Sequence, residues 1–448
     1  MRIFLPILLL GLVAAAAFAM GSRPDPAKLV SSRLREFVDA GGVPGLTAAF
    51  VTRGSVSYYS YGALPAGMDG KLDTDTLFAV ASVSKLFTTL AFAEMVREGR
   101  IVVDDPLAKF LPAGVKVPSR NGKVITLRHL ATHTAGLPVF SREEAERDRI
   151  ARAGWEALYG DLSTIQLATD PGEKFEYSNL GMALLGHVVE RVSGTPYEEF
   201  VIGRILAPLG MGVTRISLPP DSVKPVFEFN IGIFAPAGGF NSTARDLAKF
   251  VQGCLGSAPA TLMESLKITY EPRGKDANGR PLYLGWHEAG RPGRLSHGGL
   301  QHAYVGVDLK NRVGAVILCT GQTTYNEALG AAVLSTLAGE KAEFPRPRPV
   351  VVPRSGVVEK LAGEYRLKEG AGAIVVKAAA DGRTLSLSFK KDQGFTIWPE
   401  TEDLFYCKEW ACDLQFAPPK DGLSPSVNVK MAHWQGEYFR AGATDASR

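Results

Sequence analysis

Residues 81–99 read ASVSKLFTTLAFAEMVREG, and the rest of the chain is best interpreted from this stretch. Apolar residues recur at helical spacing after Val83, and Gly99 ends the pattern, so a helix is predicted to begin near Ser82. Residues three apart on a helix share a face, so the Ser82 hydroxyl and the Lys85 amine can meet. A free hydroxyl is a weak nucleophile and needs a base, which a lysine of lowered pKa can supply.

A second serine and lysine at the same spacing, Ser388 and Lys391, occur near the C-terminus. They follow the alternating run 385–389, which predicts a half-exposed strand. Positions i and i+3 of a strand point to opposite faces, so this copy is not expected to carry chemistry.

Two further motifs follow the first copy in the chain. The sequence 177–179, Tyr-Ser-Asn, comes after a Pro-Gly-Glu turn and before the helical pattern 180–192. The sequence 297–299, His-Gly-Gly, precedes two valine-rich runs at 303–309 and 315–320. These runs predict a hairpin whose first strand begins near the glycines.

In this order the three motifs resemble the S-x-x-K, S-D-N and K-T-G signature of the serine β-lactamase and penicillin-binding-protein superfamily. Tyr-x-Asn as the second motif is similar to the class C-like branch, which includes class C β-lactamases, D,D-peptidases, D-amino-acid amidases and related carboxylesterases. The stretches LRHLATHTAGLP at 127–138 and PAGGFNST at 236–243 also match the family's habits. The resemblance covers roughly residues 25–340.

The resemblance implies a role for each motif residue. Ser82 would be the nucleophile and Lys85 its base, and Tyr177 would relay protons between them and the leaving group or the hydrolytic water. Because a phenol titrates near pH ~10, positive charge on Lys85 would have to lower the Tyr177 pKa, or the two would act in concert. Asn179 would hydrogen-bond Lys85 and the substrate amide.

The third motif implies how a substrate would bind, and it departs from the β-lactamase pattern. Gly298 and Gly299 leave a strand edge on which a substrate backbone can lie. The backbone N–H groups of Ser82 and Leu300 would form the oxyanion hole. His297 replaces the usual lysine and Gly298 the usual threonine or serine, which weakens the cationic clamp for a carboxylate. His297 could bind a carboxylate when protonated or orient substrate when neutral.

The expected function is an exported serine hydrolase that forms an acyl-enzyme on amide, ester or lactam carbonyls. D,D-peptidase or amidase and esterase activities rank level, and β-lactamase activity ranks behind them because of His297. The alternative is a non-hydrolytic, penicillin-binding-like scaffold or muropeptide sensor that has lost turnover. The expected partner is a small-molecule or peptide substrate, and no cofactor is expected.

The chain is expected to have an α+β fold with a small C-terminal all-β domain. Residues 20–340 would form an antiparallel sheet flanked by helices, with a helical insertion. Residues 341–355 are proline-rich and predict a stiff linker. Short alternating runs in 356–448 predict a small β-barrel-like domain, and its start at 361–365 resembles lipocalin-like modules.

The N-terminus has the features of a signal peptide at 1–19. Arg2 precedes the apolar run 3–18, and Ala-Phe-Ala at 17–19 suits a signal peptidase. An uncleaved anchor is the alternative, although the run is short for a spanning helix. A periplasmic or secreted protein, without stable membrane insertion after cleavage, is expected.

Composition and the remaining motifs exclude several other functions. The net charge of +4 over 448 residues gives no reason to expect a nucleic-acid partner. His129 and His133 stand four apart, but Leu130 replaces the glutamate of a zinc motif, so packing or capping explains them and no metal is expected. Cys407 and Cys412 bracket a possible hairpin tip and could pair in an oxidising compartment.

Overall fold

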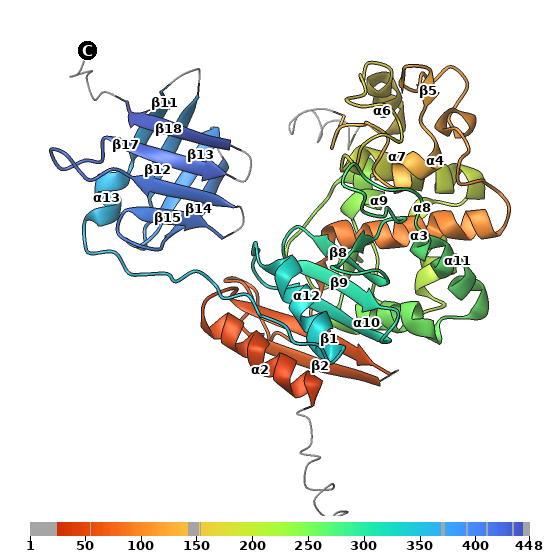
Figure 1. The fold of residues 1–448 in the computed structure, drawn as a ribbon, viewed down its shortest axis with the longest axis horizontal. Coiled ribbons are helices and arrows are strands. Elements are labelled where there is room, and N and C mark those ends of the chain that lie inside the picture. Colours follow the sequence, from red (N-terminus) through yellow and green to blue (C-terminus); the bar gives the residue numbers. More distant parts are fainter. Residues whose placement is uncertain are drawn as a thin grey trace, which may run out of the picture.

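The computed structural model describes residues 25–53, 55–141, 152, 154–368, 372–390, 393–408, 411–431 and 434–441. Figure 1 shows a mixed helix and sheet part and a separate closed barrel at the C-terminus, which confirms the expected α+β fold class. The expected signal peptide and Lys391 lie outside the described residues. Over the described ranges, no helix has both the length and the apolar character needed to cross a bilayer.

The larger part is built on one antiparallel sheet with the order β2-β1-β10-β9-β8-β7. Its strands are β1 (Gly45–Thr52), β2 (Ser55–Gly62), β7 (His287–Glu288), β8 (Arg294–Gly299), β9 (Ala303–Asp308) and β10 (Val313–Cys319). Strand β1 pairs along its length with β10, from Leu46 opposite Cys319 to Thr52 opposite Val313. The first and last strands of this part therefore meet at the centre of the sheet.

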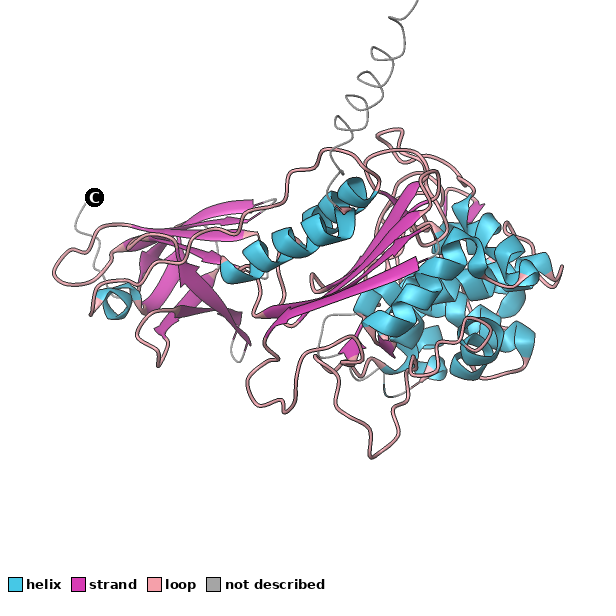
Figure 2. Ribbon diagram, turned by 90° about the horizontal axis from the view of Figure 1, so that it is seen from below, coloured by secondary structure: helices cyan, strands magenta, loops and turns pink. Residues whose placement is uncertain are grey.

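Helices cover both faces of this sheet (Figure 2). Helix α2 (Pro26–Asp39) and helix α12 (Asn326–Leu337) share a core with one face. Helix α10 (Ala244–Gln252) packs on the other face, together with the helical region. Asp25 caps α2 by accepting the Ala27 N–H, as its position before Pro26 predicted.

The helical insertion is packed around one buried helix, α3 (Ser84–Arg97). Its other helices are α4 (Leu127–Ala131), α6 (Trp155–Leu162), α7 (Asn179–Ser193), α8 (Tyr197–Val201), α9 (Ala235–Gly238) and α11 (Ala260–Tyr270). Short elements complete it: β3 (Phe78–Ala79), β4 (Ser119–Arg120), β5 (Lys123–Val124), β6 (Asn241–Ser242), η1 (Ala81–Val83), η2 (Leu107–Phe110), η3 (Ile202–Leu206), η4 (Gly232–Phe234) and η5 (Gly253–Ser257). Residues Ser84 to Met95 of α3 are all buried, because α7, α9 and α11 surround it. Gly99 follows with φ +71°, as its predicted role of helix stop requires.

The C-terminal part is a closed antiparallel barrel preceded by helix α13 (Val357–Leu361). Its strands are β11 (Gly363–Leu367), β12 (Ala373–Ala378), β13 (Leu385–Lys390), β14 (Gln393–Pro399), β15 (Leu404–Cys407), β16 (Cys412–Phe416), β17 (Ser426–Met431) and β18 (Trp434–Arg440). Strand β11 pairs with both β12 and β18, which closes the sheet. Tyr365, Phe405 and Phe416 are fully buried inside it. The alternating runs of the sequence therefore correspond to real strands.

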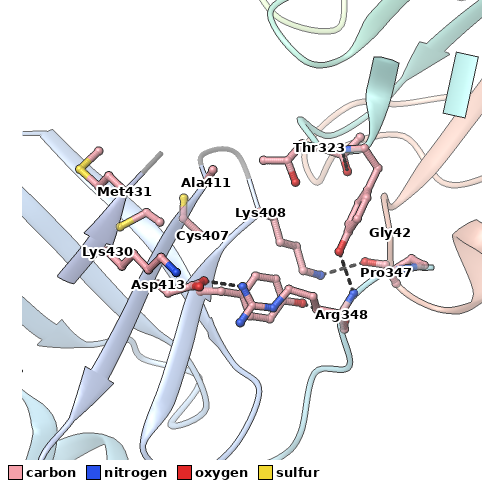
Figure 3. Close-up of a pocket in the computed structure, with 15 residues that line it drawn as sticks. Gly42, Thr323, Pro347, Arg348, Cys407, Lys408, Ala411, Asp413, Lys430 and Met431 are labelled. Carbon is pink, nitrogen blue, oxygen red and sulfur yellow. Dashed lines mark hydrogen bonds and ion pairs between the residues drawn. The ribbon is translucent and has the colours of Figure 1, made fainter. Parts of the chain in front are cut away.

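The linker and the β15–β16 hairpin contact the larger part of the molecule (Figure 3). Arg348 of the linker donates hydrogen bonds to Asp413 of the barrel, and its backbone N–H donates to the Tyr325 hydroxyl at 3.1 Å. Lys408, at the hairpin, donates from Nζ to the Gly41 carbonyl at 2.9 Å. The two parts are thus joined by polar contacts around a cavity of about 270 Å³.

Cys407 and Cys412 lie on either side of a hairpin turn, as the sequence suggested. Cys407 is the last residue of β15 and Cys412 the first of β16, and both are buried. In this described segment the structure has no disulfide between them, and burial raises the pKa of the Cys412 thiol to about 11. Cys254 and Cys319 are buried thiols.

Candidate active site

Ser82 lies in a strained turn immediately before the buried helix. It is the middle residue of η1, and Ala81 before it has φ +45°, which is uncommon for a residue with a side chain. A backbone hydrogen bond from Val80 N–H to the Phe240 carbonyl, 2.9 Å long, anchors the turn. Strain of this kind persists where surrounding structure enforces it, and here it holds a half-buried serine at the head of α3.

Lys85 meets Ser82 as the spacing predicted. Its Nζ lies 3.0 Å from Ser82 Oγ and donates to the Ala237 carbonyl at 2.6 Å. The side chain is fully buried, and this burial lowers the pKa of Lys85 well below its usual value. A lysine in this state gives up its proton readily, so its amine can serve as a base for the neighbouring hydroxyl.

Tyr177 completes a three-residue cluster around Ser82 Oγ. Its hydroxyl donates to that oxygen at 2.7 Å, and its ring faces Lys85 Nζ at 4.7 Å. Burial raises the pKa of Tyr177 to about 12, although the hydrogen bond to Ser82 acts in the opposite direction. The alternative in which Lys85 lowers the Tyr177 pKa is therefore wrong, because burial dominates for both residues. Tyr177 keeps its proton and is a hydrogen-bond donor.

His133 positions Tyr177 from the side. The two rings lie 4.5 Å apart between centroids, and His133 Nδ1 accepts the Ser178 N–H at 3.1 Å. His129 instead forms a capping box with Thr126 at the start of α4. Packing and capping thus account for both histidines, as the sequence indicated. Within the described ranges, no group of three or more His, Cys, Asp or Glu residues could hold a metal ion.

Asn179 lies at the start of α7, and among the hydrogen bonds of the described residues none joins its side chain to Lys85 as predicted. Ser178 is the N-cap of this helix, and the Asn179 backbone N–H donates to the Val139 carbonyl at 2.9 Å. Among the described residues, Lys85 Nζ takes the Ala237 carbonyl as its partner besides Ser82. A backbone carbonyl has replaced the expected side-chain amide, and no sequence motif identifies such a partner.

The two glycines of the third motif end strand β8. The predicted hairpin, β9 with β10, begins just after them at Ala303. Among the described residues, strand β7 pairs with Leu295 and Ser296, so residues 297–299 of β8 extend beyond their pairing with β7. A Cβ on Gly299 would lie 2.2 Å from the Val80 carbonyl oxygen, so glycine lets this strand approach the Ser82 turn.

His297 is buried and uncharged, which removes one of its two expected roles. Its Nδ1 donates to the Gly298 carbonyl at 2.8 Å, and its ring lies 4.9 Å from that of His287. Burial, then the proximity of His287 and Lys85, lowers the pKa of His297 well below its usual value. Burial likewise lowers the pKa of His287 to about 4. A protonated His297 that clamps a carboxylate is therefore not supported, and the neutral role is left.

A cleft of about 410 Å³ opens at these residues. It is lined by Ser82, Tyr177, His287, His297, Gly298, Leu300, Gln301, Gln322, Thr323, Thr324, Asn326 and Glu327. Leu300 has φ +38°, in the turn that follows the glycines. His287 and Glu327 belong to no motif in the sequence. His287 reaches the cleft because β7 pairs with β8. Glu327 reaches it because α12 packs against the neighbouring strands β9 and β10.

A serine between a buried lysine and a tyrosine, at the junction of an antiparallel sheet and a helical region, defines the β-lactamase and penicillin-binding-protein class of serine hydrolases. The chain belongs to the Beta-lactamase family, whose family model matches residues 30–340. The D-alanyl-D-alanine-carboxypeptidase/endopeptidase AmpH of Escherichia coli K12 is 29% identical over 332 residues, or 67% of this chain and 85% of that protein. A β-lactamase of Lysobacter lactamgenus is 28% identical over 255 residues, which cover 53% and 63%.

Solved structures agree with this assignment. The β-lactamase/D-alanine carboxypeptidase of Yersinia pestis, solved with citrate, aligns with a TM-score of 0.59 and 26% identity over 70% of this chain and 99% of that one. The octameric penicillin-binding protein homologue of Pyrococcus abyssi has a TM-score of 0.61 and 23% identity, covering 92% and 99%. The second likeness is one of fold alone.

Proposed function

We propose that this protein is an exported serine hydrolase that works through an acyl-enzyme on amide, ester or lactam carbonyls. The observation that carries the proposal is the position of Ser82 Oγ, between Lys85 Nζ at 3.0 Å and the Tyr177 hydroxyl at 2.7 Å. This arrangement supplies a base and an acid to one nucleophile. Export rests on the sequence of residues 1–19.

The proposed reaction uses the two opposed pKa shifts. The neutral amine of Lys85 takes the Ser82 proton as Oγ bonds to the substrate carbonyl carbon, whose oxygen becomes negative. The N–H groups of Ser82 and Leu300 stabilise that oxygen. The bond to the leaving group then breaks, and Tyr177 donates its proton to the leaving atom and regains one from Lys85. Water, deprotonated by the same pair, releases the acyl group and restores Ser82.

The state of His297 bears on the substrate. A penicillin or a D-Ala-D-Ala peptide carries a carboxylate near the scissile bond, and a buried neutral histidine offers it no positive charge. D,D-peptidase or amidase and esterase activities therefore remain level as proposals, with β-lactamase activity behind them. The carboxypeptidase name of the Escherichia coli relative favours the peptidase, while the neutral His297 favours the esterase.

Intact-protein mass spectrometry tests the proposal. The purified protein is mixed separately with a penicillin, a D-Ala-D-Ala peptide and a short-chain aryl ester. We expect product release from the ester or the peptide, and a transient mass increase that maps to the peptide containing Ser82. A stable adduct without product would support the non-hydrolytic scaffold instead. Absence of both adduct and product with all three reagents would contradict an acyl-enzyme mechanism.

A further inference from the structure

The carboxyl group of Glu327 occupies the space that Gly298 leaves beside the nucleophile. Glu327 lies in the first turn of α12, and its carboxyl reaches over strand β8. A Cβ on Gly298 would lie 2.0 Å from Glu327 Oε1 and 3.1 Å from its Cδ, with the Ala303 carbonyl oxygen at 3.7 Å. The glycine at the position where the β-lactamase signature has threonine or serine thus makes room for an acidic group.

Glu327 is the one cleft-lining residue, among those described, that carries a formal charge at about pH 8. The pKa values of His287 and His297 are lowered, and that of Tyr177 is raised to about 12, so all three are uncharged. Lys85 is fully buried behind Ser82. Among the described residues, therefore, no cation lines the cleft to balance the carboxylate.

The environment of Glu327 leaves its carboxylate available to a ligand. Glu327 is exposed to solvent. The surrounding protein nevertheless desolvates its carboxyl group enough to raise the pKa above the usual value. Within the described part of the chain, its side chain makes neither an ion pair nor a hydrogen bond. Tyr304 of β9 lies close enough for Glu327 to raise its pKa, and it is neutral and buried. A charge in a partly desolvated cleft acts more strongly on a nearby charge than it would in water.

We infer that Glu327 is a specificity-determining residue that disfavours substrates with a carboxylate beside the scissile carbonyl and favours substrates with an ammonium group there. The substrate class is then amides or esters that carry a cationic group in the part lying against Gly298. This inference rests on the proposed serine-hydrolase function. It concerns binding and requires no change in the chemistry of Ser82.

The test compares aryl esters of matched length at about pH 8, where the Glu327 side chain is ionised. One series ends the acyl chain in a methyl, trimethylammonium or carboxylate group, and a second carries these groups on the leaving alcohol. For the wild type we expect the cationic member to have the highest kcat/KM in at least one series. In Glu327→Gln, the ratio of cationic to anionic kcat/KM should fall about tenfold, mainly through KM.

Two further variants make the result specific. Glu359→Gln removes an exposed carboxylate on the distant helix α13 and should leave the ratio unchanged. Gly298→Ser should displace the Glu327 carboxyl and lower the ratio as well. Thermal melts of each variant show whether it is folded. If the wild type reacts with none of the esters and with neither the D-Ala-D-Ala peptide nor the penicillin, the proposed function fails. If it reacts with the peptide or the penicillin but with none of the esters, or hydrolyses the esters with a ratio that Glu327→Gln does not move in either series, this inference alone fails.

Discussion

Lys85 and Tyr365 are both fully buried polar residues, but their surroundings differ. Lys85 lies in the sheet-and-helix part that holds the proposed active site, called the catalytic part below, and Tyr365 lies in the barrel. The Tyr365 hydroxyl donates to the Leu361 carbonyl at 2.6 Å and accepts from Arg440 at 2.8 Å. Lys85 has one carbonyl and the reactive serine as partners, and its pKa is strongly lowered. In the barrel, the buried Tyr365 hydroxyl therefore has hydrogen-bond partners for its proton and its oxygen. In the catalytic part, burial of the Lys85 amine disfavours its charged form, which costs folding free energy.

The same contrast holds for other buried atoms. Buried side-chain nitrogen and oxygen atoms without a hydrogen-bond partner include His133 Nε2, His297 Nε2 and the Tyr304 hydroxyl. All such atoms among the described residues fall between positions 133 and 326, so none lies in the described part of the barrel. Unsatisfied buried groups reduce stability, and natural proteins retain them mainly at functional sites. The comparison therefore locates the chemistry in the catalytic part.

The largest expected effect comes from Ser82→Ala. Removing the nucleophile should lower kcat for an aryl ester by on the order of 10⁴-fold or more, while the short helix η1 tolerates alanine. Ser388→Ala, at the second serine-lysine spacing on strand β13, should be silent. Steady-state kinetics of both variants measure this. Substantial activity in Ser82→Ala, or a comparable loss in Ser388→Ala, would contradict the contrast between the two regions.

A second prediction follows from the lowered pKa of Lys85. The base must be neutral, so kcat/KM for a neutral ester should fall as pH decreases through this pKa and reach its plateau below pH 10.5, the usual value for lysine. Tyr177, with its pKa raised to about 12, stays protonated over that range. Lys85→Ala should cost about as much activity as Ser82→Ala, and the double variant should lose no more.

The pH profile also tests His297. Because its pKa is held well below the usual histidine value, the pH profiles of carboxylate-bearing and neutral substrates should run parallel through pH ~6.5. A selective loss of carboxylate substrates through that range would show that His297 titrates and binds them after all.

The two adjacent glycines provide a smaller and sharper comparison. In Gly299→Ala the new Cβ would meet the Val80 carbonyl oxygen at 2.2 Å, and this backbone leads directly into the Ser82 turn. Misplacing a nucleophile by about 1 Å can cost 10²-fold in rate, so we expect a loss of about that size in kcat. In Gly298→Ala only the flexible end of Glu327 must move, and the loss should be several-fold at most. Equal losses would show that Gly299 does not protect the turn.

The sequence predicted the parts of the site that depend on local spacing. Ser82 and Lys85 lie three apart on one helical turn, so their contact follows from helix geometry alone. Tyr177 could be placed only through the family resemblance, because its distance from Ser82 depends on how α7 packs against α3. The barrel strands were predictable from alternation and turn residues, although closure of the barrel depends on the pairing of β11 with β18.

The misses share a physical cause. The direction of the Tyr177 shift, the neutrality of His297 and the partner of Lys85 all depend on burial, which a single sequence does not specify. The same holds for Glu327, which reaches Gly298 only because α12 lies over the sheet beside β8. Long-range packing decides these features, and residue type and spacing alone could not indicate them.

The smallest expected effect concerns removal of the barrel. No described barrel residue lines the cleft, so a chain ending at Pro345 should retain kcat/KM for a neutral ester within about threefold. The barrel does touch one wall of the cleft, because Thr324 N–H donates to the Lys408 carbonyl at 3.1 Å. Arg348→Ala in the full chain removes the guanidinium hydrogen bond to Asp413 but keeps the backbone N–H bond to the Tyr325 hydroxyl, so it should change the rate still less.

Steady-state kinetics on the chain ending at Pro345 and on Arg348→Ala, with thermal melts to confirm folding, decide whether the barrel contributes to catalysis. A folded truncated chain that no longer reacts with an acylating probe would mean that the hairpin at Lys408 holds the Thr324 wall in its working position. The barrel would then belong to the active site through that single backbone hydrogen bond. The contrast between a catalytic part and a barrel without a role in catalysis would no longer hold. Retained activity in both forms would instead place the whole of the chemistry in the sheet and helices before the linker, where Ser82, Lys85 and Tyr177 lie.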